Sequence, residues 1–166
     1  MAVRPVLLLP DPCLTTVAAP IGAINADALT LAQDLVDTMR SRPACVGLAA
    51  PQIGVSRRAF VIDVTGHRKA KRCHGEVVLF DPVIVESGAP DPAREGCLSV
   101  PDFTGDVVRP TLVTVVGLGL DGDRRSIETD AFEARAVLHE IDHLDGLLFL
   151  DRVSSPQAVF RRKVYR

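Results

Sequence analysis

Long apolar stretches are missing from this sequence of 166 residues. No segment approaches the roughly 18–20 consecutive apolar residues of a membrane span, so we expect no membrane partner. The first residues, MAVRPVLLLPDP, hold one arginine and a short apolar run broken by prolines. That run is too short for the hydrophobic part of a secretion signal, and a cytoplasmic location is therefore expected.

The sequence also lacks a surplus of positive charge. Lysine and arginine number 19 against 21 aspartates and glutamates, which gives a formal net charge of −2. Proteins that bind a polyanion usually carry a basic excess. We therefore expect no DNA partner.

Paired cysteine motifs are absent as well. The four cysteines are scattered without a CxxC pair, at Cys13, Cys45, Cys73 and Cys97. In a chain with no export signal, free thiols or a metal ligand are favoured over disulfides. At least one thiolate is thus available to bind a metal.

No internal repeat, low-complexity block or interdomain linker interrupts the chain. Its length fits one ordinary domain with a sizeable core, and its 47% hydrophobic content is typical of globular proteins. We expect a single domain over residues 1–166.

Helical and extended patterns can be distinguished along the chain. Asn25 is a suitable N-cap for an amphipathic helix that runs to about Arg40. Residues 57–64 and 76–88 are typical of strands, the second one interrupted at Asp81-Pro82. Residues 111–130 predict a hairpin that turns at Asp121-Gly122.

A second long helix is predicted to begin near Thr129 or Asp130, with Glu133 completing part of a capping box, and to end at Gly146. The polar, basic segment between the first two strands is expected to be an exposed loop with solvated His67 and His74. The fold class is therefore α+β. We expect mainly antiparallel strands around the central second helix, an N-terminal helix and a short C-terminal tail.

The segment VLHEIDHLDG, residues 137–146, carries the strongest chemical signal. On a helix, His139 and His143 share one face and can bind one cation, while Glu140 lies beside them and can reach a metal-bound water. Chance histidines on a surface helix are the alternative. The apolar residues around the motif argue against this alternative, because they indicate a buried helix. Burying two histidines and a glutamate there without a partner is costly.

A third ligand must come from elsewhere in the chain. No histidine follows His143, which excludes the HExxHxxGxxH arrangement. Cys97 stands in the extended segment REGCLSVPDF, outside any regular apolar element. A thiolate with two imidazoles would leave one tetrahedral position open for water or substrate, so Cys97 is preferred over the other cysteines.

Three motifs together resemble those of peptide deformylases. CVGLAAPQ occupies residues 45–52, EGCLS residues 95–99 and LHEIDHLDG residues 138–146, in the family's order. The likeness extends to LLLPDPCL near the start and VLFDPVI in the middle, and so covers essentially the whole chain. It implies the peptide-deformylase fold and the removal of the formyl group from new polypeptides.

The resemblance also implies a division of roles. Cys97, His139 and His143 would bind the metal, and Glu140 would be the general acid/base. The Gln52 side-chain amide and the Leu98 backbone N–H would bind the developing oxyanion. Physically, the metal lowers the pKa of its water, and Glu140 passes the proton to the departing amine, which leaves poorly when unprotonated.

The family's preference for formylmethionine implies an apolar pocket. The face shared by Phe132, Ala136 and His139, together with Val46, is the predicted lining. Gly47 and the following alanines would let a peptide lie close to the backbone and pair as an added strand. Arg109 is expected to help hold the peptide.

One divalent metal ion is expected as the cofactor. The resemblance favours Fe²⁺ in the active enzyme, and Zn²⁺ also suits a Cys/His₂ set. N-formylmethionyl peptides and nascent chains are the expected partners. A transient ribosome contact is a further expectation, although the tail after Asp151 is short and predicts only a brief terminal helix or a solvated end.

Three positions depart from the family pattern. Cys45 replaces a glycine and is expected near the substrate channel. Leu138 replaces the glutamine before HExDH, so a polar outer partner of the metal site is lost, and Asp81 replaces an asparagine. Because of these changes, a deformylase-like protein that binds formylated peptide or ribosome with weak or no turnover remains an alternative, as does an HExxH peptidase.

Overall fold

The computed structural model describes residues 2–163 as an α+β fold, which confirms the expected fold class. The two helices are α1 (Ala26–Arg40) and α2 (Ala131–Leu144). Eight strands accompany them: β1 (Gly47–Ala49), β2 (Ala59–Ile62), β3 (Val77–Ser87), β4 (Pro90–Cys97), β5 (Val100–Pro110), β6 (Leu112–Leu118), β7 (Arg124–Asp130) and β8 (Val159–Arg161).

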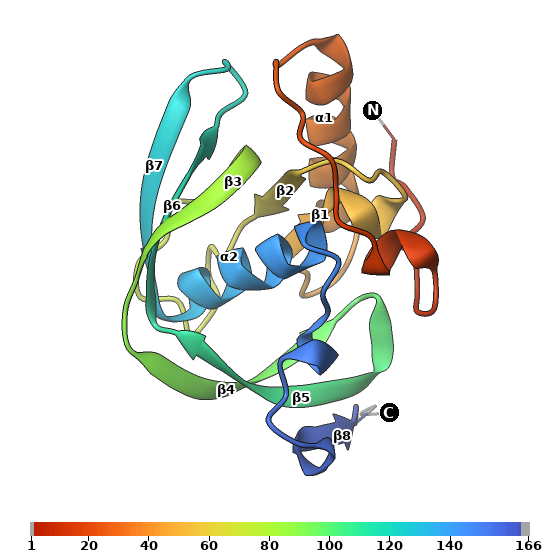
Figure 1. Ribbon diagram of the computed structural model, residues 1–166, viewed down its shortest axis with the longest axis vertical. Helices are drawn as coiled ribbons and strands as arrows, with labels where there is room; N and C mark the ends of the chain where they lie inside the picture. Colours follow the sequence, from red (N-terminus) through yellow and green to blue (C-terminus); the bar gives the residue numbers. More distant parts are fainter. Residues whose placement is uncertain (1, 164–166) are drawn as a thin grey trace.

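The strands form two antiparallel sheets. A five-stranded sheet has the order β1-β2-β3-β6-β7, and a three-stranded sheet has the order β4-β5-β8. Figure 1 shows α2 crossing the middle of the molecule, with the long β4–β5 ribbon passing beside it. The helix that carries HEIDH is therefore the central element, as predicted.

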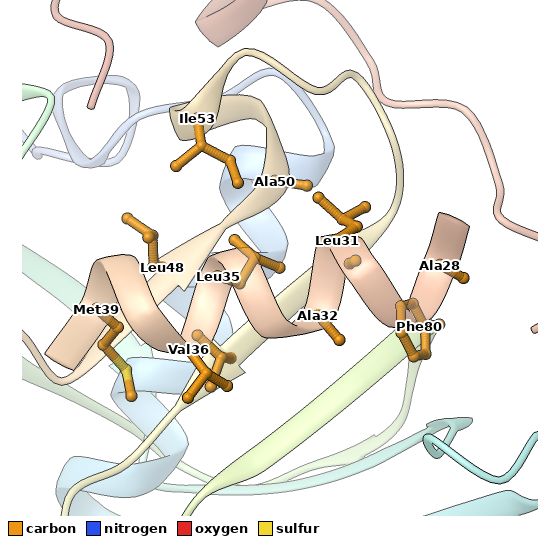
Figure 2. Close-up of a cluster of buried hydrophobic side chains, with 12 residues drawn as sticks. Ala28, Leu31, Ala32, Leu35, Val36, Met39, Leu48, Ala50, Ile53 and Phe80 are labelled. Carbon is orange, nitrogen blue, oxygen red and sulfur yellow. The ribbon is translucent and has the colours of Figure 1, made fainter. Parts of the chain in front are cut away.

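Helix α1 covers the end of the larger sheet that holds β1 and β2. The Asn25 side chain accepts a hydrogen bond from the Ala28 N–H at 3.0 Å, which confirms the predicted N-cap. Figure 2 shows the apolar stripe of α1 packed against Leu48, Ala50, Ile53 and Phe80. This cluster fixes the segment that follows β1, where Gln52 lies in a short 3-10 helix (Ala50–Ile53).

The start of α2 differs from the expected capping box. Asp130 is the N-cap residue, but its side chain makes no capping hydrogen bond. The fully buried Glu133 instead accepts hydrogen bonds from the His74 N–H and ring nitrogen, both at 2.8 Å. The prediction failed because a distant loop supplies better donors for this carboxylate than the helix end does.

The C-terminal tail is also not helical as predicted. Only a three-residue 3-10 turn (Pro156–Ala158) precedes β8, and β8 pairs with Phe103–Gly105 of β5. Since β5 offers an unpaired edge, the tail gains backbone hydrogen bonds there that a short isolated helix could not match.

The cysteines and the two helices can be compared with what the sequence lacked. All four cysteines lie in the described residues and are free thiols. Within residues 2–163, neither helix combines the length and apolar character that a membrane span requires.

The interruption of β3 at Asp81 has a structural explanation. Asp81 has a φ of 48° at a shift in the β3–β6 register. Its two carboxylate oxygens accept hydrogen bonds from the N–H groups of Ile21 and Gly22, both at 2.8 Å. The residue thus ties the N-terminal segment to the sheet.

Replacing Asp81 by asparagine should therefore destabilise the fold. The amide keeps the shape but offers only one acceptor oxygen, so one of the two N–H groups loses its partner. We expect the free energy of unfolding to fall by about 1 kcal/mol, measured by urea denaturation. Glu86→Gln, an exposed change on the same strand, is the matched control. Equal stability of both variants with the wild type would contradict this role of Asp81.

Candidate active site

The central helix and the end of β4 bring three predicted ligands together. His139 and His143 lie one turn apart on α2, with ring centroids separated by 5.0 Å. Ligand atoms of Cys97, His139 and His143 all lie within 4.8 Å of one another. The Cys97 Sγ is 3.2 Å from the His143 Nε2. One thiolate and two imidazoles at such distances form a group that can hold a metal ion.

Cys97 reaches this position because the β4–β5 pairing shifts at its end. Gly96 pairs with Thr104, whereas Cys97 pairs with Val100 across a tight turn. The sulfur is buried, with Cys97 only 4% exposed. The turn residues Leu98 and Ser99 are consequently held close to the three ligands.

The three groups also shift each other's protonation. Burial raises the pKa of Cys97, but His143 and His139 outweigh this effect and hold the pKa well below its usual range. For His139, burial lowers the pKa, and the hydrogen bonds to Cys97 and Glu95 raise it well above its ordinary value. The sulfur therefore favours the thiolate form, which is the form that binds metals.

Glu95 orients His139 from behind. Its Oε2 lies 3.0 Å from the His139 Nδ1. Burial raises the pKa of Glu95, but hydrogen bonds from His139 and Arg109 lower it to about 2. An ionised carboxylate only accepts, so His139 must donate from Nδ1, which leaves Nε2 as its ligand atom.

Arg109 does not lie at the cavity, where a residue that holds the peptide is expected. The residue is 4% exposed and does not line the cavity. Its guanidinium donates to Glu95 at 2.5 and 3.0 Å and to Asp142 at 2.8 Å. This position does not support the predicted role in holding the peptide, because the guanidinium is buried and three of its five N–H groups donate to two buried carboxylates.

Glu140 is buried next to the ligands with one oxygen lacking a partner. Within the described part of the chain, its Oε2 makes no hydrogen bond, and neither does the His143 Nδ1. Burial raises the pKa of Glu140 to about 7, with His139 and His143 opposing and Cys97 adding to the shift. A buried carboxylate oxygen without a donor is costly, so the site fits a polar group or ion that would face it.

Gly47 is required beside Glu140. A Cβ at Gly47 would lie 2.4 Å from the Glu140 Oε1, so any side chain there would displace the carboxylate. The sequence predicted that a peptide would approach β1 at this glycine. In the structure, the Glu140 carboxylate lies close to β1 there.

Gln52 is oriented by its neighbours. Its Oε1 accepts from the Ala49 N–H at 2.9 Å, and because that N–H can only donate, the amide orientation is determined. The Nε2 then lies 3.4 Å from the Cys97 Sγ and 3.2 Å from the Ser99 Oγ. The structure thus places the Gln52 amide donor against the ligand cluster.

A cavity of about 400 Å³ opens onto these groups. Its walls include Leu98, Gly47 and the residues of the predicted lining, namely Val46, Phe132, Ala136 and His139. Cys45 also lines it, with Sγ 3.1 Å from the Gly47 carbonyl oxygen. Burial, with Glu140 adding, raises the pKa of Cys45 to about 11, so it remains a neutral thiol.

The other two departures lie away from the cavity. Leu138 packs in a cluster with Val113 and Ala134 and is not a lining residue. Asp81 holds Ile21 and Gly22, as described above. Neither substitution removes a group from the cavity wall.

Sequence reasoning missed several lining residues. His67, expected to be solvated, stacks on Phe132 with ring centroids 3.8 Å apart and an angle of 7°. Burial, Lys69 and Arg68 lower the pKa of His67, so its neutral ring suits an apolar wall. Lys69, Arg94 and Arg162 also line the cavity. No local sequence pattern indicated that these side chains would line the cavity.

The chain matches the family model of Polypeptide deformylase over residues 3–159. It is 43% identical to the peptide deformylase of Desulforudis audaxviator over 164 residues, 98% of this chain and 99% of that protein. Two solved structures share its fold closely. The peptide deformylase of Legionella pneumophila has a TM-score of 0.85 at 41% identity, covering 95% of this chain and 89% of that chain. The Met-Ala-Ser-bound peptide deformylase of Acinetobacter baumannii has a TM-score of 0.84 at 36% identity, covering 92% and 100%.

Arg109→Met tests the structural interpretation of Arg109. The variant leaves the Glu95 and Asp142 carboxylates buried without their shared cation. We expect the free energy of unfolding to fall by about 3–5 kcal/mol in urea denaturation. Arg125→Gln, which breaks the exposed pair with Asp121, should leave stability unchanged. A stable Arg109→Met protein with a raised KM for peptide would instead support the original expectation.

Proposed function

Because the chain belongs to the peptide deformylase family, we propose that the residues gathered at its cavity carry that family's reaction. The chain is a hydrolase that removes the N-formyl group from the N-terminal formylmethionine of new polypeptides and releases formate. These relationships do not favour the alternative of a binding protein without turnover. The residue roles below are our proposal, and residues 1–166 are proposed to act as one catalytic domain.

Cys97, His139 and His143 would hold one divalent metal ion. The single observation that carries this proposal is the convergence of their ligand atoms within 4.8 Å, from a strand end and a helix far apart in the sequence. The unpartnered Glu140 Oε2 beside them supports it. When bound, the ion supplies Lewis-acid activation of water at neutral pH.

Glu140 would move the proton. Its carboxylate accepts a proton from the attacking water and then delivers it to the nitrogen of the departing α-amine. The Nε2 of Gln52 and the N–H of Leu98 would donate to the oxygen that gains charge as the formyl carbon is attacked. Two such donors contribute about 3 kcal/mol each. The Ala49 N–H keeps Gln52 in the required orientation.

The apolar wall would receive the methionine side chain. Val46, Phe132 and Ala136 line the cavity beside His139, and Gly47 lets the peptide backbone approach β1. His67 extends this wall through its stack on Phe132. A cavity that combines this apolar wall with polar groups at the ligand cluster suits a formylated methionyl peptide.

Two finer assignments belong to the same proposal. We place the enzyme in the cytoplasm, where nascent formylated chains are its substrates. A transient ribosome contact would be supported by exposed cations in the loop after β2 and at Arg161 and Lys163, because such groups are attracted to RNA phosphates.

Glu140→Gln should separate catalysis from metal binding. The variant keeps all three proposed ligands, so elemental analysis should find the same metal content as in the wild type. Formate release from formyl-Met-Ala-Ser should fall about 10²–10⁴-fold, because the amide cannot transfer the proton. Glu86→Gln is the control for the same chemical change at an exposed site. An undiminished rate would refute the proton-transfer role, and cleavage inside an unformylated protein would indicate a peptidase.

The ion of the active enzyme is proposed to be Fe²⁺, with Zn²⁺ as the ion that purified protein could carry. Protein loaded anaerobically with Fe²⁺ should lose activity in air while Zn²⁺-loaded protein keeps its own, because a thiolate on redox-active iron is open to oxidation. Formate release over time and mass spectrometry of Cys97 would measure this. Equal air stability of both forms, with Zn²⁺ the more active, would contradict the assignment.

A further inference from the structure

The C-terminal strand brings a side chain into the cavity that the proposed reaction does not use. After β8, the Arg162 N–H donates to the Asp102 carbonyl oxygen at 2.8 Å, so the tail continues along β5. Arg162 then becomes part of the cavity wall.

Its guanidinium lies against the strand that carries Cys97. The Nη2 is 3.4 Å from the Cys97 carbonyl oxygen. A Cβ at Gly96 would lie 2.4 Å from the same nitrogen, so the guanidinium occupies space that the glycine leaves open. Arg162 is thus held next to the proposed reaction centre, on the β4 side of the cavity.

Both other arginines of the cavity wall have carboxylate partners. Arg94 pairs with Asp106 and lies over the Phe160 ring, and Arg135 pairs with Glu95. Among residues 2–163, no acidic side chain forms an ion pair with Arg162. Within that range, only one of its five N–H groups makes a hydrogen bond, to the Cys97 carbonyl oxygen, and Lys69 adds a second cation to the cavity lining.

We propose that Arg162 binds a carboxylate of the peptide substrate downstream of formylmethionine and gives the enzyme a preference for acidic peptides. The inference rests on the proposed function, because the formyl group must lie at Cys97 and Glu140 for the geometry to hold. An extended peptide advances about 3.3 Å per residue, so a peptide that runs from Cys97 along the exposed Gly96 would bring its second or third residue near Arg162. A planar guanidinium matches a carboxylate there better than an ammonium does.

Steady-state formate release from amidated peptides tests this preference. Formyl-Met-Ala-Ser-amide is the neutral reference, and formyl-Met-Asp-Ser-amide and formyl-Met-Ala-Asp-amide carry the acidic side chain. At low ionic strength we expect kcat/KM to be about two- to fivefold higher for at least one acidic peptide, mainly through KM. The ratio should shrink in 0.5 M salt, because exposed charges are screened.

Variants at neighbouring arginines identify the residue. Arg162→Gln should bring the acidic-to-neutral ratio close to one, and Arg162→Lys should restore much of it. Arg161→Gln removes a charge at the adjacent position, outside the cavity wall, and should keep the wild-type ratio. Formyl-Met-Ala-Ser with a free carboxyl end distinguishes an α-carboxylate from an acidic side chain as the group bound.

A wild-type ratio of one for all carboxylate-bearing peptides, or a ratio that survives in Arg162→Gln, would overturn the inference while leaving deformylation intact. A response to the free carboxyl end alone would support carboxylate binding and exclude selection among nascent chains. Absence of formate from the neutral peptide would instead overturn the proposed function. The two failures are therefore distinguishable.

Discussion

The buried ion-pair network behind His139 is the constraint on which the site depends. Glu95 lies at the end of β4, Arg109 on β5 and Asp142 on α2, so this one network joins the ribbon to the central helix. Its charges are almost entirely removed from water. Such a network adds little net stability, but a buried charge that loses its partner is costly. Any shift of β4 away from α2 would separate these partners, so the network determines where β4 lies against α2. Cys97, two residues after Glu95, is placed opposite the two histidines as a result.

The sequence predicted the parts of the fold that depend on local chemistry. The Asn25 cap, the interruption at Asp81 and the helical face shared by His139 and His143 need only nearby residues. The predicted convergence of Cys97 with that face rested on its place in the extended segment REGCLSVPDF and on the motif resemblance. Periodicity describes residues that are close together in the chain, so it gives no information on such a long-range contact.

The failures of prediction have one common cause. Local patterns suggested a helix cap for Glu133 and a solvated loop for His67, and Arg109 was expected at the substrate. Each side chain instead meets a partner from another element. Long polar or aromatic side chains have several local options, and only tertiary packing selects among them. For the same reason, no pattern in the basic tail indicated that Arg162 would reach the cavity.

Two glycines show how the cavity accommodates its polar groups. Gly47 on β1 and Gly96 on β4 lie on its wall, and a Cβ at either would come within 2.4 Å of a charged side chain, Glu140 or Arg162. On both strands, the space that a side chain would take is therefore occupied by one of these charged groups. In our proposals, the carboxylate beside the glycine on β1 transfers the proton, and the guanidinium beside the glycine on β4 binds a carboxylate of the peptide.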